Sequence, residues 1–121
     1  MKRVYLKEIL RTEASTPTNY TKDDQVKPGN LLVVKSLALT WSGMKTTETA
    51  QFYIQDGGQQ IFIGEDVPDC QGGHAFWQGE AFVGEGDLIG AYTPDSVDGD
   101  VIIFDIVGEL WDLKDWEKMV E

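Results

Sequence analysis

Residues 49–63 read TAQFYIQDGGQQIFI, two short runs rich in apolar residues on either side of Asp56-Gly57-Gly58. An Asp-Gly pair between two such runs is the strongest short-range signal of a β-hairpin, because the turn needs positive φ and glycine adopts it without steric cost. We therefore expect strands at 49–55 and 59–63 that pair antiparallel.

The flanking sequence repeats this pattern of short strand and turn. Residues 31–41 carry large apolar side chains at alternate positions, interrupted only by Lys35, which is typical of a strand buried on one face. Further strands are expected at 75–83, 88–92 and 101–107, with Gly, Pro or Asp at the breaks between them. Short strands at regular spacing, without long helical periods, predict an antiparallel β-sandwich or barrel.

Both ends of the chain depart from this pattern. Residues 2–11 fit either a first strand or a single helical turn, and 12–30 contain the Thr, Ser, Asn and Pro typical of a linker or an extended arm. Residues 111–121 change to helical spacing, with Asp112 and Asp115 placed as in a capping box. A helix this short is marginal alone, so we expect it to dock on the body or on a neighbour.

The chain has 121 residues, enough for one domain with a buried core. Its formal net charge of −11 argues against nucleic acid as a partner, because phosphate binding needs clusters of Lys and Arg. Residues 1–45 hold eight bases and four acids (+4), whereas 46–121 hold two bases and seventeen acids (−15). We expect the basic segment to lie on an acidic surface of its own fold, of a neighbouring subunit or of a partner. No apolar run approaches the ~20 residues that span a bilayer, so no membrane partner is expected and cytosolic synthesis is the default.

The sequence offers little for a catalytic centre. Cys70 stands among acidic residues, which disfavour the thiolate that a nucleophile needs, and His74 is the only histidine. One Cys and one His cannot supply four zinc ligands. With 21 acids, two carboxylates fall within catalytic distance by chance, so such pairs carry no information. We expect no catalytic residue, no cofactor, no metal and therefore no enzyme.

A stretch near the C-terminal third resembles a calcium loop only superficially. Val97 and Gly99 stand where the ligands of such a loop are needed. A hairpin turn is the simpler interpretation, and whether Asp95, Asp98 and Asp100 bind a cation stays open.

The aromatic residues are expected to form the core of the sandwich. Most alternate with polar neighbours, which indicates side chains that point inward. A carbohydrate- or other ligand-binding β-sandwich is the alternative, and it would need two or three of these rings exposed and coplanar. The rings expected inside are Trp41, Phe52, Tyr53, Phe62, Phe76, Trp77, Phe82, Tyr92 and Phe104.

Residues 75–110 contain a recurring arrangement of turns, Trp77-x-Gly79, Gly86-Asp87-x-Ile89-x-Ala91-Tyr92, Gly99-Asp100-x-Ile102 and Gly108-Glu109-Leu110. This arrangement resembles small jelly-roll β-sandwich proteins of tailed bacteriophage virions, especially head decoration (cement) proteins and related head or tail accessory proteins. The resemblance implies an all-β, jelly-roll-like antiparallel sandwich of seven or eight strands. Its body would be 31–110, with an N-terminal strand and extended arm in 1–30 and a short amphipathic helix at 111–121.

The same resemblance implies a structural virion protein on the capsid surface, which binds and stabilises neighbouring capsid subunits. Its partners would be the major capsid protein or other virion subunits, and further copies of itself, with a trimer favoured. A phage head–tail or tail accessory component is a variant of this role. The residues expected to contact partners are Lys2, Arg3, Lys7, Arg11, Trp111, Trp116 and Met119.

Overall fold

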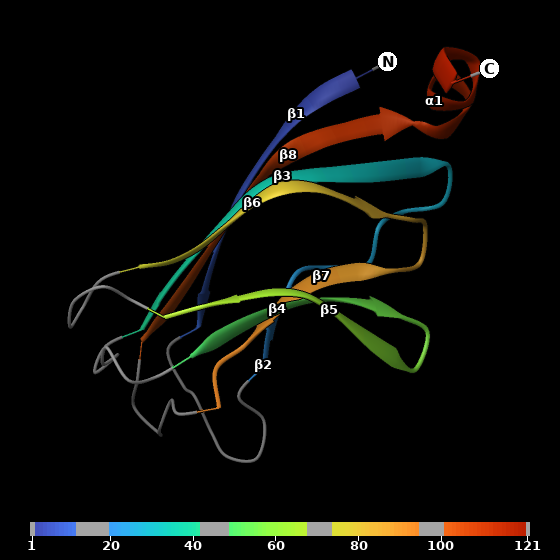
Figure 1. Ribbon diagram of the computed structural model, residues 1–121. Helices are drawn as coiled ribbons and strands as arrows, with labels where there is room; N and C mark the ends of the chain where they lie inside the picture. The colour runs from blue at the N-terminus through green and yellow to red at the C-terminus, as the bar shows by residue number, and fades with distance from the viewer. Residues whose placement is uncertain (1, 12–19, 42–48, 68–73, 95–100, 121) are drawn as a thin grey trace.

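The computed structural model describes residues 2–11, 20–41, 49–67, 74–94 and 101–120, which form eight strands and one helix (Figure 1). In chain order the elements are β1 (Lys2–Arg11), β2 (Tyr20–Lys22), β3 (Asn30–Trp41), β4 (Ala50–Asp56), β5 (Gln59–Asp66), β6 (Ala75–Val83), β7 (Leu88–Tyr92), β8 (Ile102–Asp112) and α1 (Leu113–Val120).

The strands form two antiparallel sheets of four strands each, which lie as two layers in Figure 1. The first sheet has the order β1-β8-β3-β6 and the second has the order β2-β7-β4-β5. Two sheets that share the chain in this interleaved way are the arrangement of a jelly roll. The predicted fold class, an all-β jelly-roll-like sandwich with a short C-terminal helix, is therefore confirmed.

The hairpin predicted at 49–63 is present as β4 and β5. Asp56 pairs with Gln59 across the turn, and Gly57 has the positive φ (61°) that the Asp-Gly signal requires. β4 is also paired with β7 on its other side, so the hairpin forms half of the second sheet.

Strand β3 contains a β-bulge that changes which residues face the core. Its register against β8 shifts at Lys35, so Leu32 and Val34 face the core before the bulge and Leu37 faces it afterwards. The prediction of one alternating face along 31–41 is therefore wrong, because a single extra residue exchanges the two faces of a strand.

The core lies between the two sheets, where Phe52 of β4 and Phe104 of β8 stack with ring centroids 6.3 Å apart. Trp77 of β6 packs against this core, and two glycines make room for it. A Cβ at Gly64 would lie 2.7 Å from Cδ1 of Trp77, and one at Gly79 would lie 3.1 Å from Cζ2. Glycine at these positions lets β5 and β6 close one side of the sandwich around the indole.

Several aromatic rings predicted to lie in the core lie elsewhere. Tyr53 is fully buried, but it follows Phe52 on β4 and therefore points to the opposite face of the second sheet. The side chain of Trp41 is outside the described part. The rings that are about half-exposed on the outside of the sandwich are Phe62, Phe76 and Phe82.

The N-terminal segment contributes to both sheets. Residues 2–11 form a strand, β1, which pairs with β8 from Lys2 to Arg11 at the edge of the first sheet. The stretch from residue 20, expected to be linker or arm, instead joins the second sheet. β2 pairs with β7, and the backbone N–H of Asp23 donates to the carbonyl of Ile89 at 3.0 Å. Residues 12–19 lie outside the description.

The C-terminal helix begins two residues later than predicted, because β8 continues to Asp112. The carboxylate of Asp112 accepts a hydrogen bond from the backbone N–H of Lys114 at 2.9 Å, as an N-cap does. The backbone N–H of Leu113 donates to the carbonyl of Gly29 at 2.9 Å. The helix is therefore fixed to the body at its first turn.

Candidate functional site

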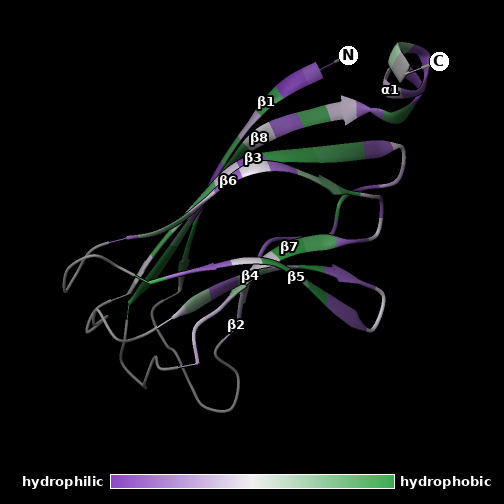
Figure 2. Cartoon of the chain, viewed as in Figure 1, coloured by the Kyte–Doolittle hydropathy of each residue, from purple (hydrophilic) through white to green (hydrophobic). Residues whose placement is uncertain are grey.

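The outer face of the first sheet, turned away from the second sheet, has exposed large apolar side chains on three of its four strands. Their exposed fractions run from 41% for Val107 to 76% for Val4. Figure 2 shows apolar and polar residues alternating along β1 and β8. The members, which we call the outer apolar face, are Val4, Leu6, Leu10, Phe76, Phe82 and Val107.

The strand register places these side chains in rows across the sheet. Leu6 of β1 lies opposite Val107 of β8, and Val107 lies opposite Ser36 of β3. Directly opposed residues have Cβ atoms about 4.5–5.5 Å apart on the same face. Leu6 and Val107 are therefore neighbours on the outer face. The next strand, β3, presents the small side chains of Ser36 and Ala38 on the same face.

Helix α1 covers one end of the outer face. The ring of Trp116 lies 5.5 Å from Phe82 and 5.3 Å from Trp111, both on the outer face of the sheet. Leu31 and Val33, which also point outward from β3, are only 8% and 1% exposed. We call this region the covered end and the region from Leu6 to Leu10 the open end.

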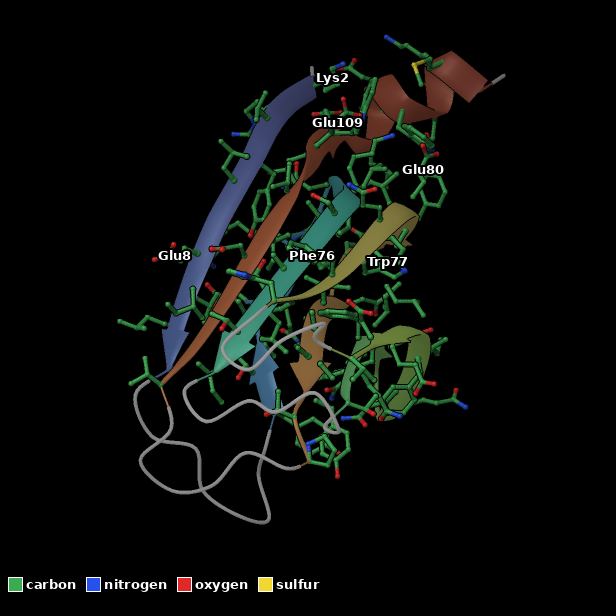
Figure 3. The ribbon with its side chains drawn as sticks, turned by 60° about the vertical axis from the view of Figure 1, so that its left-hand side comes forward. Lys2, Glu8, Phe76, Trp77, Glu80 and Glu109 are labelled. Atoms are coloured by element: carbon green, nitrogen blue, oxygen red, sulfur yellow. The ribbon has the colours of Figure 1, made fainter. Side chains whose placement is uncertain are left out.

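Exposed ion pairs border the covered end. The ammonium of Lys2 lies 3.1 Å from the Glu109 carboxylate and 5.6 Å from the centre of the Trp111 ring (Figure 3). The hydrogen bond from Lys2 lowers the pKa of Glu109. Lys35, at the bulge, pairs with Glu80 of β6 at 2.6 Å. Such exposed pairs contribute little to stability, so they leave the apolar contacts as the main adhesive feature of this face.

The open end has a shallow depression of about 470 Å³ between β1 and β8. Leu6 and Val107 form its apolar part, and the carboxylates of Glu8 and Asp105 border it. Glu8 and Asp105 lie directly opposite each other on neighbouring strands. A surface that combines exposed apolar groups with a polar border is typical of protein–protein contacts.

The sequence-predicted partner residues lie in different places. Lys2, Trp111 and Trp116 meet at the covered end, where both indoles are partly buried in the molecule's own packing. Met119 of α1 is exposed. Arg11 is the last residue of β1, and its side chain is outside the described part. None of the six residues of the outer apolar face is among the predicted partner residues, because alternation along a strand does not reveal which of its two faces is buried.

Lys7 belongs to a polar cluster under β1 instead of a free surface. Its ammonium is paired with the Asp23 carboxylate at 2.5 Å and with Asp24 at 3.2 Å. The Tyr5 hydroxyl donates to the other oxygen of Asp23 at 2.5 Å. The hydrogen bond to Asp23 raises the pKa of Lys7, and burial together with the same carboxylate raises the pKa of Tyr5. The cluster ties β1 to the chain that follows β2.

Beside this cluster a cleft of about 320 Å³ opens between β1 and residues 23–27. Arg3, another predicted partner residue, lines this cleft together with Lys27. No carboxylate among the described residues forms an ion pair with either of these two cations. The cleft is thus lined by three cations and by two carboxylates, Asp23 and Asp24, which both pair with Lys7, so Arg3 and Lys27 leave its border with a net positive charge.

The outer face of the second sheet holds a compact group of tyrosines. Tyr20 and Tyr92 are stacked on each other, with centroids 4.6 Å apart, and Tyr20 meets Tyr53 edge-on at 5.8 Å. Burial raises the pKa of Tyr53 to about 12. Because Tyr20 and Tyr92 cover each other, their rings do not lie side by side as a flat platform of the kind that a sugar-binding face would need.

The remaining candidates of the sequence are not brought into a site. His74 is exposed and its ring stacks on Phe76 at 5.5 Å. Cys70, Asp95, Asp98 and Asp100 lie outside the described residues. Within the part of the chain that is described, no group of three His, Cys, Asp or Glu side chains is arranged to hold a metal ion. Nor does a helix in that part have the length and apolar character to cross a membrane.

No protein-family model matches the chain, and no curated protein matches it either. Among solved structures, the chain is similar to the Drosophila NLP core, whose structure is described as giving insight into pentamer formation and histone binding. The similarity covers 86% of this chain and 96% of the other, with 13% identity and a TM-score of 0.48. A similarity of this size assigns neither a partner nor an assembly to this chain.

Proposed function

We propose that this protein is a structural protein that binds neighbouring protein subunits through the outer apolar face of its first sheet. The observation that carries the proposal is the exposure of six large apolar side chains on one face of one sheet. Exposed apolar side chains gathered on one face with polar groups beside them are typical of interaction sites, and here Glu8 and Asp105 lie among them. The rest of the strand alternation already supplies a complete core, so the fold itself does not need these side chains outside.

Binding energy in such contacts comes from a few apolar and aromatic anchors that lose water on docking. Phe76 and Leu6, on opposite edges of the sheet, are 59% and 70% exposed and are the most suitable anchors. Between them, β3 presents the small side chains of Ser36 and Ala38, and β8 presents Val107 and Asp105. An apolar element of a neighbouring subunit would dock against the two anchors.

The more specific form of the proposal is a head decoration protein of a tailed bacteriophage, bound to the major capsid protein at the capsid surface. Its support is the resemblance of the turns in residues 75–110 and the suitability of a rigid jelly roll as a clamp between subunits. A clamp stabilises a shell because it binds the assembled form and not the separate subunits. This role requires no catalytic group.

The experiment is co-sedimentation with empty shells built from the capsid protein encoded in the same genome. We expect the wild-type chain to sediment with the shells. Val107→Lys should weaken the binding at least tenfold, because it replaces an exposed apolar contact of this face with a charge. Val67→Lys is the matched control, since Val67 is 43% exposed and Val107 is 41% exposed.

Equal binding by both variants would remove the outer apolar face from the proposal. A genome that encodes no capsid protein would contradict the decoration role, and the general proposal would then be tested against the subunits encoded beside this chain.

A further inference from the structure

The two open sides of the sandwich carry opposite charge. The sheet orders place β1 and β2 at one side and β6 and β5 at the other. The first side, comprising β1, β2 and residues 23–29, contains six Lys and Arg and three acids, a formal charge of +3. The second side, comprising β5 and β6, contains three acids and no Lys or Arg, a formal charge of −3. We call them the basic side and the acidic side.

On the basic side the internal ion pairs leave positive charge available. Lys7 is occupied by Asp23 and Asp24, whereas Arg3 and Lys27 border the open cleft and have no ion pair among the described residues. β1 is also an edge strand. Within the described chain it pairs with β8 only, so the backbone groups along its outer edge have no strand partner.

On the acidic side, β5 and β6 are joined to each other and present acids to the outside. The Asp66 carboxylate accepts a hydrogen bond from the backbone N–H of Phe76 at 2.7 Å, which fixes the two strands together. Glu65 is exposed and has no ion pair among the described residues, and Glu80 is half-exposed with Lys35 as its partner. The accessible charge on this side is therefore mainly that of Glu65, whereas Glu80 shares its charge with Lys35 of β3.

Both sides also expose large apolar side chains beside their charges. The basic side has Val4 at 76% and Leu10 at 58% exposure, and the acidic side has Ile61 at 48% and Phe62 at 50%. An edge strand has a row of unpaired backbone N–H and C=O groups at which another chain can pair. Apolar contact supplies adhesion at each side, and opposite charge determines which sides meet.

From these observations we propose that copies of this chain associate head to tail, with the basic side of one copy docked against the acidic side of the next. A contact between two identical sides, about a two-fold axis, would oppose +3 to +3 or −3 to −3 and is disfavoured. Head-to-tail contacts use two different surfaces and continue from copy to copy until the rotation closes a ring. The inference goes beyond the proposed function, because the contact uses only Val4 and Leu10 at the border of the outer apolar face and leaves Leu6 and Val107 available for another protein.

The test is charge reversal on each side, followed by mixing. Arg3→Glu with Lys27→Glu makes the basic side negative, and Glu65→Lys with Glu80→Lys makes the acidic side positive. Each double variant then has two sides of like charge and should sediment as a monomer under conditions in which the wild type forms oligomers. An equimolar mixture should recover the oligomers, because every contact between the two variants again joins opposite charges.

The matched control is Lys114→Glu with Lys118→Glu, which makes the same charge change as Arg3→Glu with Lys27→Glu but on α1, outside the strands of both sides, and should assemble like the wild type. Sedimentation velocity at low and high salt gives the sizes, and circular dichroism confirms that each variant is folded. If a reversal variant is not folded, Arg3→Gln with Lys27→Gln replaces it. The protein concentration needed to form oligomers should then rise at least tenfold.

A wild type that is monomeric at all concentrations would overturn the inference, and so would a mixture that stays monomeric while each variant is folded. Oligomers of unchanged size in both variants would overturn it as well. Val107→Lys should leave the oligomer intact, so a failure of shell binding and a failure of head-to-tail assembly are distinguished.

Discussion

The covered and open ends of the first sheet's outer face are made by the same strands but have different neighbours. At the covered end, before the bulge, β3 turns Leu31 and Val33 outward, and α1 lays Trp116 across that region. At the open end, after the bulge, β3 turns the small side chains of Ser36 and Ala38 outward. Strand β3 thus has large outward side chains where α1 covers them and small outward side chains where nothing in the described chain does.

This difference separates two uses of an apolar surface. The covered end contributes to the stability of the monomer, because its side chains leave water on folding. The open end contributes little to that stability, because Leu6 and Leu10 stay largely exposed in the folded chain. Substitutions at the covered end should therefore lower the stability of the monomer, whereas substitutions at the open end should weaken binding to a partner.

The largest effect is expected at the boundary between the ends. Gly108 of β8 lies opposite Val34, next to the bulge, and a Cβ there would lie 2.3 Å from the carbonyl oxygen of Val33. Because this contact is with backbone, Gly108→Ala must shift two strands and should cost about 3–5 kcal/mol of unfolding free energy. Urea unfolding measures it, and a cost below about 1 kcal/mol would show that the boundary is pliable.

The strands themselves could be predicted because their signals are local. Alternation, and Gly or Asp at the breaks, located β3 to β8 and the hairpin at 56–59. The faces could not be predicted in the same way, because the bulge at Lys35 depends on pairing with β8. Phe76 and Trp77 are adjacent, so only one of them can face the core, and the sequence alone does not say which.

The next largest loss of stability is expected when the cover that α1 gives to the covered end is removed. Trp116→Ala removes the contacts with Phe82 and Trp111 and exposes the outward side chains of β3. We expect a loss of about 2–3 kcal/mol, less than for a fully buried Trp, because this indole is only partly buried. Thermal and urea unfolding measure the loss. Shell binding should change less than stability, and the reverse result would assign α1 to the partner interface.

Other features were out of reach of sequence reasoning for a different reason. β2 is three residues long and has no apolar alternation to reveal it. The polar cluster of Tyr5, Lys7 and Asp23 joins residues far apart in the chain. The sequence shows that the N-terminal segment is basic, but only the fold shows that Lys7 pairs with Asp23 inside the molecule while Arg3 borders an open cleft.

A smaller change in unfolding free energy is expected from a change of pH. Strand β1, which forms part of the open end, is held by the cluster of Tyr5, Lys7 and Asp23, and two of these groups titrate at alkaline pH. The pKa values of Lys7 and Tyr5 are raised by Asp23 and, for Tyr5, first by burial. The contribution of these two groups to the free energy of unfolding is complete below the unfolded-state pKa values of about 10. It is lost as the pH rises through the higher pKa values of the folded state. Stability should therefore fall above about pH 10, and Tyr5→Phe, costing about 1 kcal/mol at neutral pH, should make that fall shallower. If unfolding free energy falls with pH as steeply in Tyr5→Phe as in the wild type, Tyr5 does not cause the alkaline loss of stability.

The smallest effect on stability is expected for Leu6→Ser, and its comparison with Leu31→Ser tests the division of the face most directly. Both leucines point outward from the same sheet, but Leu6 is 70% exposed and Leu31 is 8% exposed. Leu31→Ser should cost about 2–3 kcal/mol, since it removes buried apolar area under α1. Leu6→Ser should stay within about 0.5 kcal/mol, because the side chain is already in water. Shell binding should show the opposite order, with Leu6→Ser the weaker binder among folded variants. Equal losses of stability at the two positions would mean that the open end is covered within the monomer, and the face would then have no adhesive surface to offer a partner.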